Sequence, residues 1–347
     1  MRHHAPHLHA VFEGYYSKFT LPSGASLIVI VCSVPKAAKN RHQLSFTYVP
    51  ADSQNVIQHE LWVDDIQRIP YASNNAFEIR VPGVGVMRCP DASTTEYTFR
   101  HQQCVLQAKT SGPQAWSGFA STPEGLLVYL PLPLHWHVHS LGSIAEYELD
   151  FPGTASLPVS DRKGEATVHE EKNWAHSFPS AHMWVQAWDA TSAHHGVCLA
   201  GGKVLGMEAY LVGYRNSRCG LNLTFRPPFA LSAMKLSPFM RLHRDWTDRF
   251  FELEIYGWNY RIAITAQAPK GTFFSLSAPF HDGHRENYLA QSLAAQATVK
   301  VWRRRGWLSW LGIGRWERVC EERFEKAALE FGGTYYPLAG NDARKNA

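Results

Sequence analysis

The segment from Val11 to Phe19 places a carboxyl group among aromatic side chains. Side chains alternate between the two faces of a β-strand, so Glu13 and Tyr15 would share one face. Gly14, between bulky neighbours, indicates that a backbone or a ligand approaches closely. The carboxylate is either a desolvated acid that takes part in chemistry or a solvent-exposed charge, and the local pattern leaves both readings open.

A second segment, residues 183–188, sets an amide between two indoles. On a strand, Trp184, Gln186 and Trp188 would share one face. A primary amide in such apolar surroundings needs a hydrogen-bond partner. That partner is either the backbone or a hydroxyl group of a substrate.

Three histidines, His135, His137 and His139, would point to one side of a strand. Two histidines separated by one residue on a strand can bind zinc when a further ligand comes from elsewhere in the chain. No acidic or cysteine ligand stands at a supporting spacing, so we expect no metal. We expect these histidines to bond to a substrate or to the backbone instead.

Residues 301–316 combine indoles, leucines and arginines in a loop bounded by glycines. Interfacial surfaces of membrane-binding proteins combine tryptophan and apolar residues with flanking basic ones. We therefore hypothesise that this loop contacts a membrane or lipid body, and the alternative is that it folds back into the core. The contacting side chains would be Trp307, Leu308, Trp310 and Leu311.

The composition excludes several classes of protein. The chain of 347 residues is 45% hydrophobic, 18% charged and 13% aromatic, with a net charge of +4. It has neither a broad basic face nor a nucleic-acid-binding module, so we expect no nucleic-acid partner. Six scattered cysteines without a ligand spacing predict free thiols in a reducing compartment. The N-terminus lacks an apolar signal core, which favours the cytoplasm.

The pattern of elements predicts an all-β protein. Residues 27–34 form an apolar run typical of a central strand, and residues 145–151 alternate between acidic and apolar side chains. Residues 251–264 also alternate but change phase near Gly257, which indicates a bulge or a turn. Only residues 288–297 have a helix-like pattern, and we expect one short helix there.

The Pro-, Gly- and Ser-rich segment 151–165 is the best candidate for a domain boundary. We expect two antiparallel barrel- or sandwich-like halves, with a cavity between or within them. The N-terminal half would span residues 1–158 and the C-terminal half residues 159–340. Residues 341–347 would form a disordered tail.

Three stretches resemble the tocopherol cyclase family. The most specific runs from residues 171–174 (EKNW) to residues 184–186 (WVQ), and the others are residues 12–16 (FEGYY) and 327–333 (AALEFGG). The resemblance implies a lipocalin-like two-barrel fold, shared with carotenoid hydratases and fungal cyclases, and closure of a chromanol ring on a prenylated quinol. Ala175 and Trp188 depart from the family pattern, which leaves the particular substrate open.

Such ring closure protonates an isoprenoid alkene in a water-free cavity, and a phenol oxygen captures the cation. The acid must stay protonated near neutral pH, as a carboxyl group in an apolar pocket can. The resemblance points to Glu13 and Glu171 as candidate acids, and no cofactor is implied. Candidate residues for binding the hydrophobic substrate are Tyr15, His137, Trp174, His176, Trp184, Gln186 and Trp258.

Three other functions are compatible with the sequence. The first is a hydratase or a pericyclic cyclase that acts on another hydrophobic polyene. The second is a non-catalytic carrier of lipids or isoprenoids. The third is a metalloenzyme that uses the face formed by His135, His137 and His139.

The hypothesis of membrane contact predicts that the protein floats with liposomes and that replacing Trp307 and Trp310 together by serine abolishes flotation. The reason is that the two indoles would supply much of the apolar area buried in the interface. Flotation of the wild type and the double variant in a sucrose gradient measures this. Equal flotation of the two proteins, or no flotation of the wild type, contradicts the hypothesis.

Overall fold

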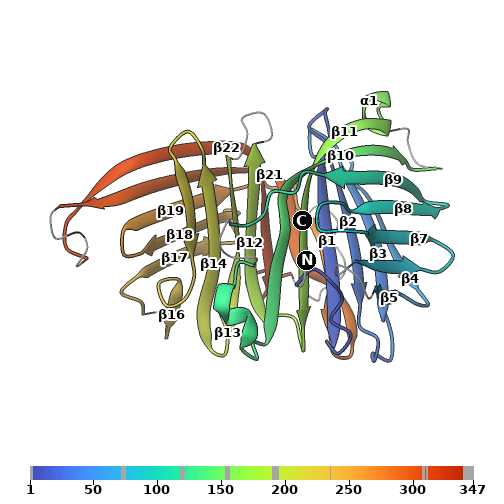
Figure 1. Cartoon of the computed structure of the whole chain (residues 1–347), viewed down its shortest axis with the longest axis horizontal. Coiled ribbons are helices and arrows are strands. Elements are labelled where there is room, and N and C mark those ends of the chain that lie inside the picture. Colours follow the sequence, from blue (N-terminus) through green and yellow to red (C-terminus); the bar gives the residue numbers. More distant parts are fainter. Residues whose placement is uncertain are drawn as a thin grey trace. The chain divides into compact units, whose positions relative to one another are not determined.

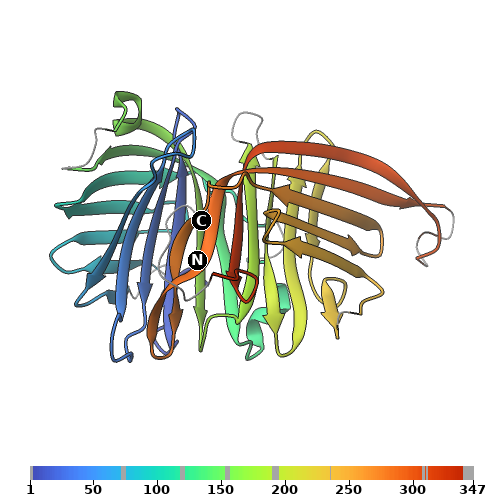
Figure 2. The ribbon, with the colours of Figure 1, turned by 180° about the vertical axis from the view of Figure 1, so that it is seen from behind.

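The computed structural model describes residues 3–71, 76–117, 122–152, 157–189, 195–234, 236–306, 309 and 312–338. These residues form two sheets, and every strand pair whose register is resolved is antiparallel, so the all-β expectation is confirmed. Figures 1 and 2 show the strands from two opposite sides. No helix in the described part of the chain has the length and apolarity to cross a membrane.

The first sheet has eleven strands in the order β4-β3-β2-β1-β11-β10-β9-β8-β7-β6-β5. Its bounds are β1 Phe12–Thr20, β2 Ser26–Ser33, β3 His42–Val49, β4 Ile57–Val63, β5 Gln67–Pro70, β6 Phe77–Val81, β7 Gly85–Cys89, β8 Glu96–His101, β9 Cys104–Ser111, β10 Leu134–Asp150 and β11 Lys163–Ala175. Two short helical turns accompany it, η1 Gly125–Tyr129 and α1 Val159–Arg162.

The first sheet curls around its own core. Phe19 on β1 contacts Tyr97 on β8 with ring centroids 5.3 Å apart, although three strands lie between β1 and β8 in the sheet order. Phe46 on β3 likewise meets Phe99 on β8 at 5.7 Å. Opposite parts of the same inner face therefore pack together, and they bury a continuous apolar cluster.

The second sheet contains the order β15-β14-β13-β12-β22-β21-β19-β18-β17, with β16 paired to β14 and β20 paired to β21. Its bounds are β12 Ala181–Asp189, β13 His195–Val204, β14 Met207–Asn216, β15 Leu221–Phe225, β16 Leu231–Ala233, β17 Met240–Asp245, β18 Phe250–Tyr256, β19 Tyr260–Gln267, β20 Phe274–Phe280, β21 Gly283–Arg305 and β22 Arg315–Gly333. This sheet curls as well, because Tyr210 on β14 contacts Phe251 on β18 at 6.0 Å.

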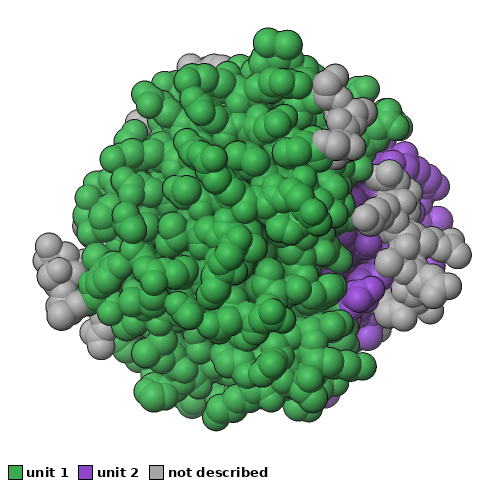
Figure 3. All heavy atoms as spheres, turned by 90° about the vertical axis from the view of Figure 1, so that its right-hand side faces the viewer, with its two compact units in different colours: residues 1–178, 278–285 green, residues 179–277, 286–347 purple. Residues whose placement is uncertain are grey.

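The chain divides into two compact units, which Figure 3 colours separately. The first comprises residues 1–178 and 278–285, and the second comprises residues 179–277 and 286–347. The division lies at 178/179 rather than at 158/159, because β11 pairs with both β1 and β10 of the first sheet. The expected tail, residues 341–347, lies outside the described residues.

The helix expected at residues 288–297 is wrong. These residues belong to β21, which pairs with β22 along its length. Register shifts between Ser292, Ala295 and Ala297 interrupt the two-residue alternation. The alanines favour a helix locally, but pairing with β22 and burial of the alanines in the core override that preference.

Other local predictions are confirmed. Residues 145–150 of β10 alternate between buried apolar and exposed acidic side chains. Gly257 lies in the turn between β18 and β19, where its N–H donates to the carbonyl of Tyr260. The phase change of the pattern therefore marks a turn.

The expectation of free thiols is correct for four cysteines and wrong for two. Cys32, Cys89, Cys104 and Cys198 are free and buried. Cys219 and Cys320 form a disulfide that links the turn after β14 to β22, with Cα atoms 6.2 Å apart. Cysteine spacing in the sequence does not reveal the pair, because 101 residues separate its members.

Replacing Cys219 by serine should lower the free energy of unfolding by about 3 kcal/mol, because a cross-link over a long loop restricts the unfolded chain. Thermal unfolding with and without dithiothreitol measures the effect. The reductant should lower the melting temperature of the wild type and leave that of the variant unchanged. A wild type insensitive to the reductant would show that the disulfide does not contribute to stability.

Candidate functional site

The polar centre of the first unit is built on three adjacent strands. In the register between β1 and β11, Glu13 stands opposite Trp174, and Tyr15 stands opposite Lys172. On the other side of β11, His137 of β10 also stands opposite Lys172. Partners directly across a pair of strands point to the same face. The register therefore gathers a carboxylate, an amine, an imidazole and two aromatic rings on one face.

Glu13 and Lys172 form a fully buried ion pair. The Lys172 Nζ and Glu13 Oε1 atoms are 2.7 Å apart, and neither side chain is exposed. Arg68 donates from Nη1 to Glu13 Oε2 at 3.3 Å, and the His7 backbone N–H donates to Oε1 at 2.7 Å. Burying a charge is costly unless it is paired and hydrogen-bonded. The carboxylate meets both conditions.

The surroundings fix the protonation of this pair. Burial by itself would raise the pKa of Glu13, but the charge of Lys172 and the hydrogen bonds from His7 and Lys172 lower it to about 2. Burial lowers the pKa of Lys172 to about 8, although Glu13 opposes that change. Near neutral pH Glu13 is therefore ionised and Lys172 is protonated. The protonated carboxyl group expected of a general acid is not found at Glu13.

The N-terminal segment closes over Lys172. The ammonium group donates to the carbonyls of His4 and Ala5 and lies 2.9 Å from His7 Nδ1. Lys172 Nζ also lies over the rings of Tyr15 and Trp174, 5.0 and 5.3 Å from their centroids. Each such contact stabilises a desolvated cation by about 1–2 kcal/mol. The segment 3–9 is thus part of the site.

Three imidazoles, those of His4, His137 and His139, gather beside the ion pair. Both ring nitrogens of His4 and of His137 are buried and have no hydrogen-bond partner among the described residues. Burial, together with the neighbouring imidazoles and Lys172, holds the pKa of His4 and of His137 well below the usual value. Each ring is therefore neutral near pH 7 and offers one donor and one acceptor.

These imidazoles also form a group that could hold a metal ion. One nitrogen from each of His4, His137 and His139 lies within 4.8 Å of the others. However, the rings of His4 and His139 are stacked, 4.0 Å apart and only 6° from parallel. Lone pairs lie in the ring planes, so the two rings do not aim at a common point. The arrangement therefore does not match the tetrahedral geometry that zinc prefers.

His135 departs from the expectation for the histidine strand. Its Nδ1 atom lies 2.8 Å from Glu124 Oε2, and the backbone N–H of Trp136 donates to the other oxygen of Glu124. Its ring stacks on Trp174 at 5.0 Å, and the ring of His7 stacks on Trp174 at 4.0 Å. His135 thus orients the indole of Trp174. The third imidazole beside His137 and His139 is that of His4 rather than that of His135.

The structure gathers four of the candidate residues and separates the rest. Glu13, Tyr15, His137 and Trp174 contact the group around Lys172 directly or through His3, His4 and His7. Glu171 lies on the opposite face of β11, where its Oε2 atom is 3.0 Å from His169 Nε2. His176 is exposed just after β11.

The remaining candidates belong to the second unit or lie outside the described residues. Trp184 and Gln186 are buried on β12, on the face away from the apolar cluster of that unit. Trp258, at a turn, is 52% exposed. The expected membrane contacts Trp307, Leu308, Trp310 and Leu311 are not among the described residues.

Sequence reasoning missed His4, His7, Arg68 and Lys172. Lys172 lies within the segment that carries the family resemblance, and the N-terminal run of histidines was visible. The alternation of β11 was the available signal, because it places Lys172 and Trp174 on the same face. Nothing local marks Arg68, which reaches Glu13 from a strand at the edge of the sheet.

Comparison with solved structures agrees with this fold. Kievitone hydratase from Nectria haematococca is 9% identical over 96% of this chain and 92% of its own, with a TM-score of 0.52. An AttH-like protein from Nitrosomonas europaea is 10% identical over 95% of both chains, with a TM-score of 0.50. CghA with Sch210972 is 11% identical over 93% of this chain and 88% of its own, with a TM-score of 0.48.

At these identities the likeness establishes the fold alone. The chain has the lipocalin-like fold of two sheets that the AttH-like protein and kievitone hydratase share. No family model matches the sequence, and no curated protein is significantly similar to it.

Replacing Glu13 by glutamine should lower the free energy of unfolding by about 3–5 kcal/mol near neutral pH, because it leaves Lys172 buried without its counter-charge. The lowered pKa of Glu13 gives the wild type stability that is present above pH 4.5 and is lost as the pH falls toward 2. The variant should lack this acid-sensitive contribution. Urea unfolding at several pH values measures both effects.

Glu148→Gln is the matched control, because Glu148 pairs with Lys163 on the surface with 56% of its side chain exposed. Its effect should stay within about 0.5 kcal/mol. Equal effects of the two variants would show that the buried pair does not stabilise the fold.

Proposed function

We propose that the protein is an enzyme that acts on a hydrophobic small molecule bearing a hydroxyl or carbonyl group, by proton transfer of the lyase or isomerase type. The observation that carries this proposal is the pair of buried neutral imidazoles, His4 and His137, with unpartnered nitrogens beside Lys172. Unpartnered buried polar groups are costly, and they are a feature of binding and catalytic sites.

The charges of the site favour a developing oxyanion over a carbocation. Lys172 and Arg68 together outweigh Glu13 by one positive charge while Lys172 is protonated. Fixed positive charge in a desolvated site stabilises negative charge that appears in the transition state. A ligand oxygen that loses its proton beside this group would therefore be stabilised.

The proposed reaction is an addition of a hydroxyl oxygen to a conjugated double bond, in which the product keeps every atom of the two reacting groups. The hydroxyl proton passes to an imidazole nitrogen of His137 as the oxygen forms its bond to carbon. The proton then returns to the carbon at the other end of the double bond. Ring closure and hydration are the intramolecular and intermolecular forms of this step.

The resemblance to the tocopherol cyclase family fits this reaction class in its outcome, the closure of a ring on a prenylated phenol. The resemblance also implies a carboxylic acid that donates a proton to the alkene, and this part does not fit, because ionised Glu13 cannot protonate an alkene. We therefore assign Glu13 to the positioning of Lys172. We keep as proposals a cytoplasmic location, a peripheral membrane contact through residues 307–311 and the absence of a nucleic-acid partner.

Replacing His137 by phenylalanine should reduce turnover by about 100- to 10,000-fold, because the variant keeps the apolar contacts and loses the proton acceptor. The substrates are identified by mass spectrometry of lipids extracted from the purified protein, followed by a panel of phenols that bear a conjugated double bond. Product formation measures catalysis, and quenching of tryptophan fluorescence measures binding. His176→Phe, at an exposed position, is the matched control and should turn over normally.

Stoichiometric binding without any product would overturn the enzyme proposal in favour of a carrier. Turnover by the wild type that His137→Phe leaves unchanged would instead overturn the assignment of this site. The two results are therefore distinguishable.

Turnover should fall as the pH rises through about 8, because Lys172 then loses the positive charge that stabilises the oxyanion. The Lys172→Met variant should be slow at every pH and should lack this alkaline decrease. Initial rates between pH 6 and pH 10 measure it. A wild-type profile that stays flat across that range would contradict the role of Lys172.

A further inference from the structure

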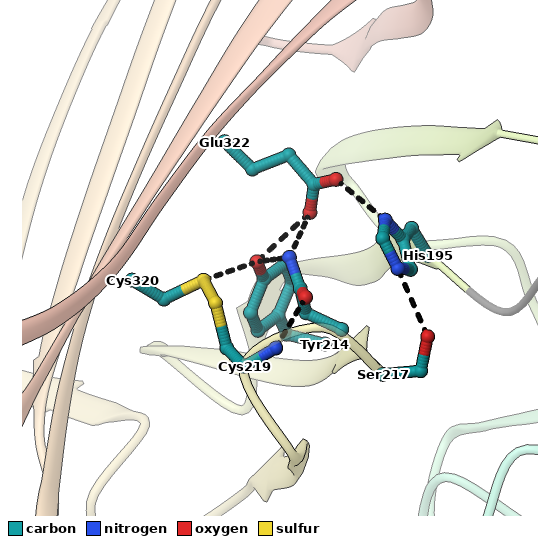
Figure 4. The surroundings of a disulfide bond; sticks show 7 residues. His195, Tyr214, Ser217, Cys219, Cys320 and Glu322 are labelled. Atoms are coloured by element: carbon teal, nitrogen blue, oxygen red, sulfur yellow. Dashed lines mark hydrogen bonds and ion pairs between the residues drawn. A yellow bond between two sulfur atoms is a disulfide. The ribbon is translucent and has the colours of Figure 1, made fainter. Parts of the chain in front are cut away.

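The second unit contains a separate cluster of polar side chains around a buried histidine, shown in Figure 4. His195 begins β13 and has a fully buried side chain. Its Nε2 atom lies 3.0 Å from the Oγ atom of Ser217, which is exposed in the turn after β14. Its Nδ1 atom lies 3.0 Å from Oε1 of Glu322 on β22.

The partners of His195 determine its tautomer. A carboxylate only accepts hydrogen bonds, so the Nδ1 atom that faces Glu322 must carry the proton. The Nε2 atom of the neutral ring is then an acceptor and takes the hydrogen bond from the Ser217 hydroxyl. This is the arrangement in which an imidazole removes the proton of a serine as the oxygen attacks.

Glu322 is itself held in place. Its Oε2 atom accepts hydrogen bonds from the Tyr214 hydroxyl at 2.9 Å and from Asn216 Nδ2 at 2.7 Å. The carboxylate therefore has a fixed orientation toward His195. Nucleophile, base and orienting carboxylate come from three separate parts of the sheet, and each link between them is a 3.0 Å contact.

The disulfide secures the turn that carries the serine. Cys219, two residues after Ser217, is bonded to Cys320, two residues before Glu322. The backbone N–H of Cys219 donates to Asn216 Oδ1 at 2.9 Å, and the N–H of Gly220 donates to the carbonyl of Ser217 at 3.1 Å. The cross-link thus ties the nucleophile to the strand that bears the carboxylate (Figure 4).

We propose that Ser217, His195 and Glu322 form a serine acyl-transfer site for small carboxylic esters, an activity beyond the proton transfer proposed for the first unit. The Ser217 oxygen attacks the ester carbonyl while its proton passes to His195 Nε2. The C–O bond of the ester then breaks, and the leaving alkoxide takes that proton as an alcohol. Water attacks the acyl-serine in the same way and releases the acid.

Both Ser217 and His195 are catalytic residues in this proposal, because they exchange the proton with the reacting atoms. Glu322 is a positioning residue that acts through His195. The exposure of Ser217 gives an ester direct access from solvent. Activity at this site does not depend on the binding of a hydrophobic substrate by the first unit.

Labelling of the full chain with a fluorophosphonate probe tests the proposal. Peptide mass spectrometry should find the probe on Ser217, and His195→Gln should slow labelling by about 100-fold or more. Added imidazole should restore part of that rate. Ser93, an exposed turn serine bonded to Asp91, is the internal control and should remain unlabelled.

Hydrolysis of p-nitrophenyl acetate provides the second readout. Ser217→Ala should abolish the protein-dependent rate, and a cooperative thermal transition should show that the variant remains folded after it loses the hydrogen bond to His195. Glu322→Gln should lower kcat at least 10-fold while KM changes less than threefold. The proposal would be overturned if the probe is absent from Ser217 or if His195→Gln does not slow labelling. These contacts would then have a structural role only.

Discussion

The burial of one ion pair, Glu13 with Lys172, constrains the strand register and the path of the N-terminal segment in the first unit. Two charges without access to water are tolerated only where partners surround them. Glu13 obtains these partners from Arg68 and from the N-terminal segment, and Lys172 obtains them from backbone carbonyls of the same segment. The register of β1 against β11 and the path of residues 3–9 therefore depend on each other.

The same pair explains the chemical character of the neighbouring residues. Burial, the neighbouring imidazoles and the charge of Lys172 hold the pKa of His4 and of His137 well below the usual value, so these rings are neutral. The carboxylate stays ionised, which separates this site from one that protonates alkenes. Likeness to kievitone hydratase extends to the fold, and the arrangement of these side chains is what supports a particular chemistry.

The second unit uses buried polar groups differently. Around His195 every ring nitrogen has a partner, and a disulfide two residues from Glu322 fixes the geometry. Around His4 and His137 the nitrogens have none among the described residues. In the second unit, His195 is already hydrogen-bonded to Ser217 and Glu322. In the first unit, the ring nitrogens of His4 and His137 can form hydrogen bonds with the polar atoms of a bound ligand.

The sequence by itself determined the strands and the faces of their side chains, because alternation is a local property of an extended chain. It placed Glu13 beside Tyr15 correctly and marked the turn at Gly257. Only the tertiary structure decided that residues 288–297 are a strand, since pairing with β22 outweighs the helix preference of alanine. It alone also showed that Glu13 and Glu171 lie on opposite faces and that Lys172 is the partner of Glu13. Partners, burial and pKa depend on strand order and on the curling of the sheet, which bring together residues more than a hundred positions apart.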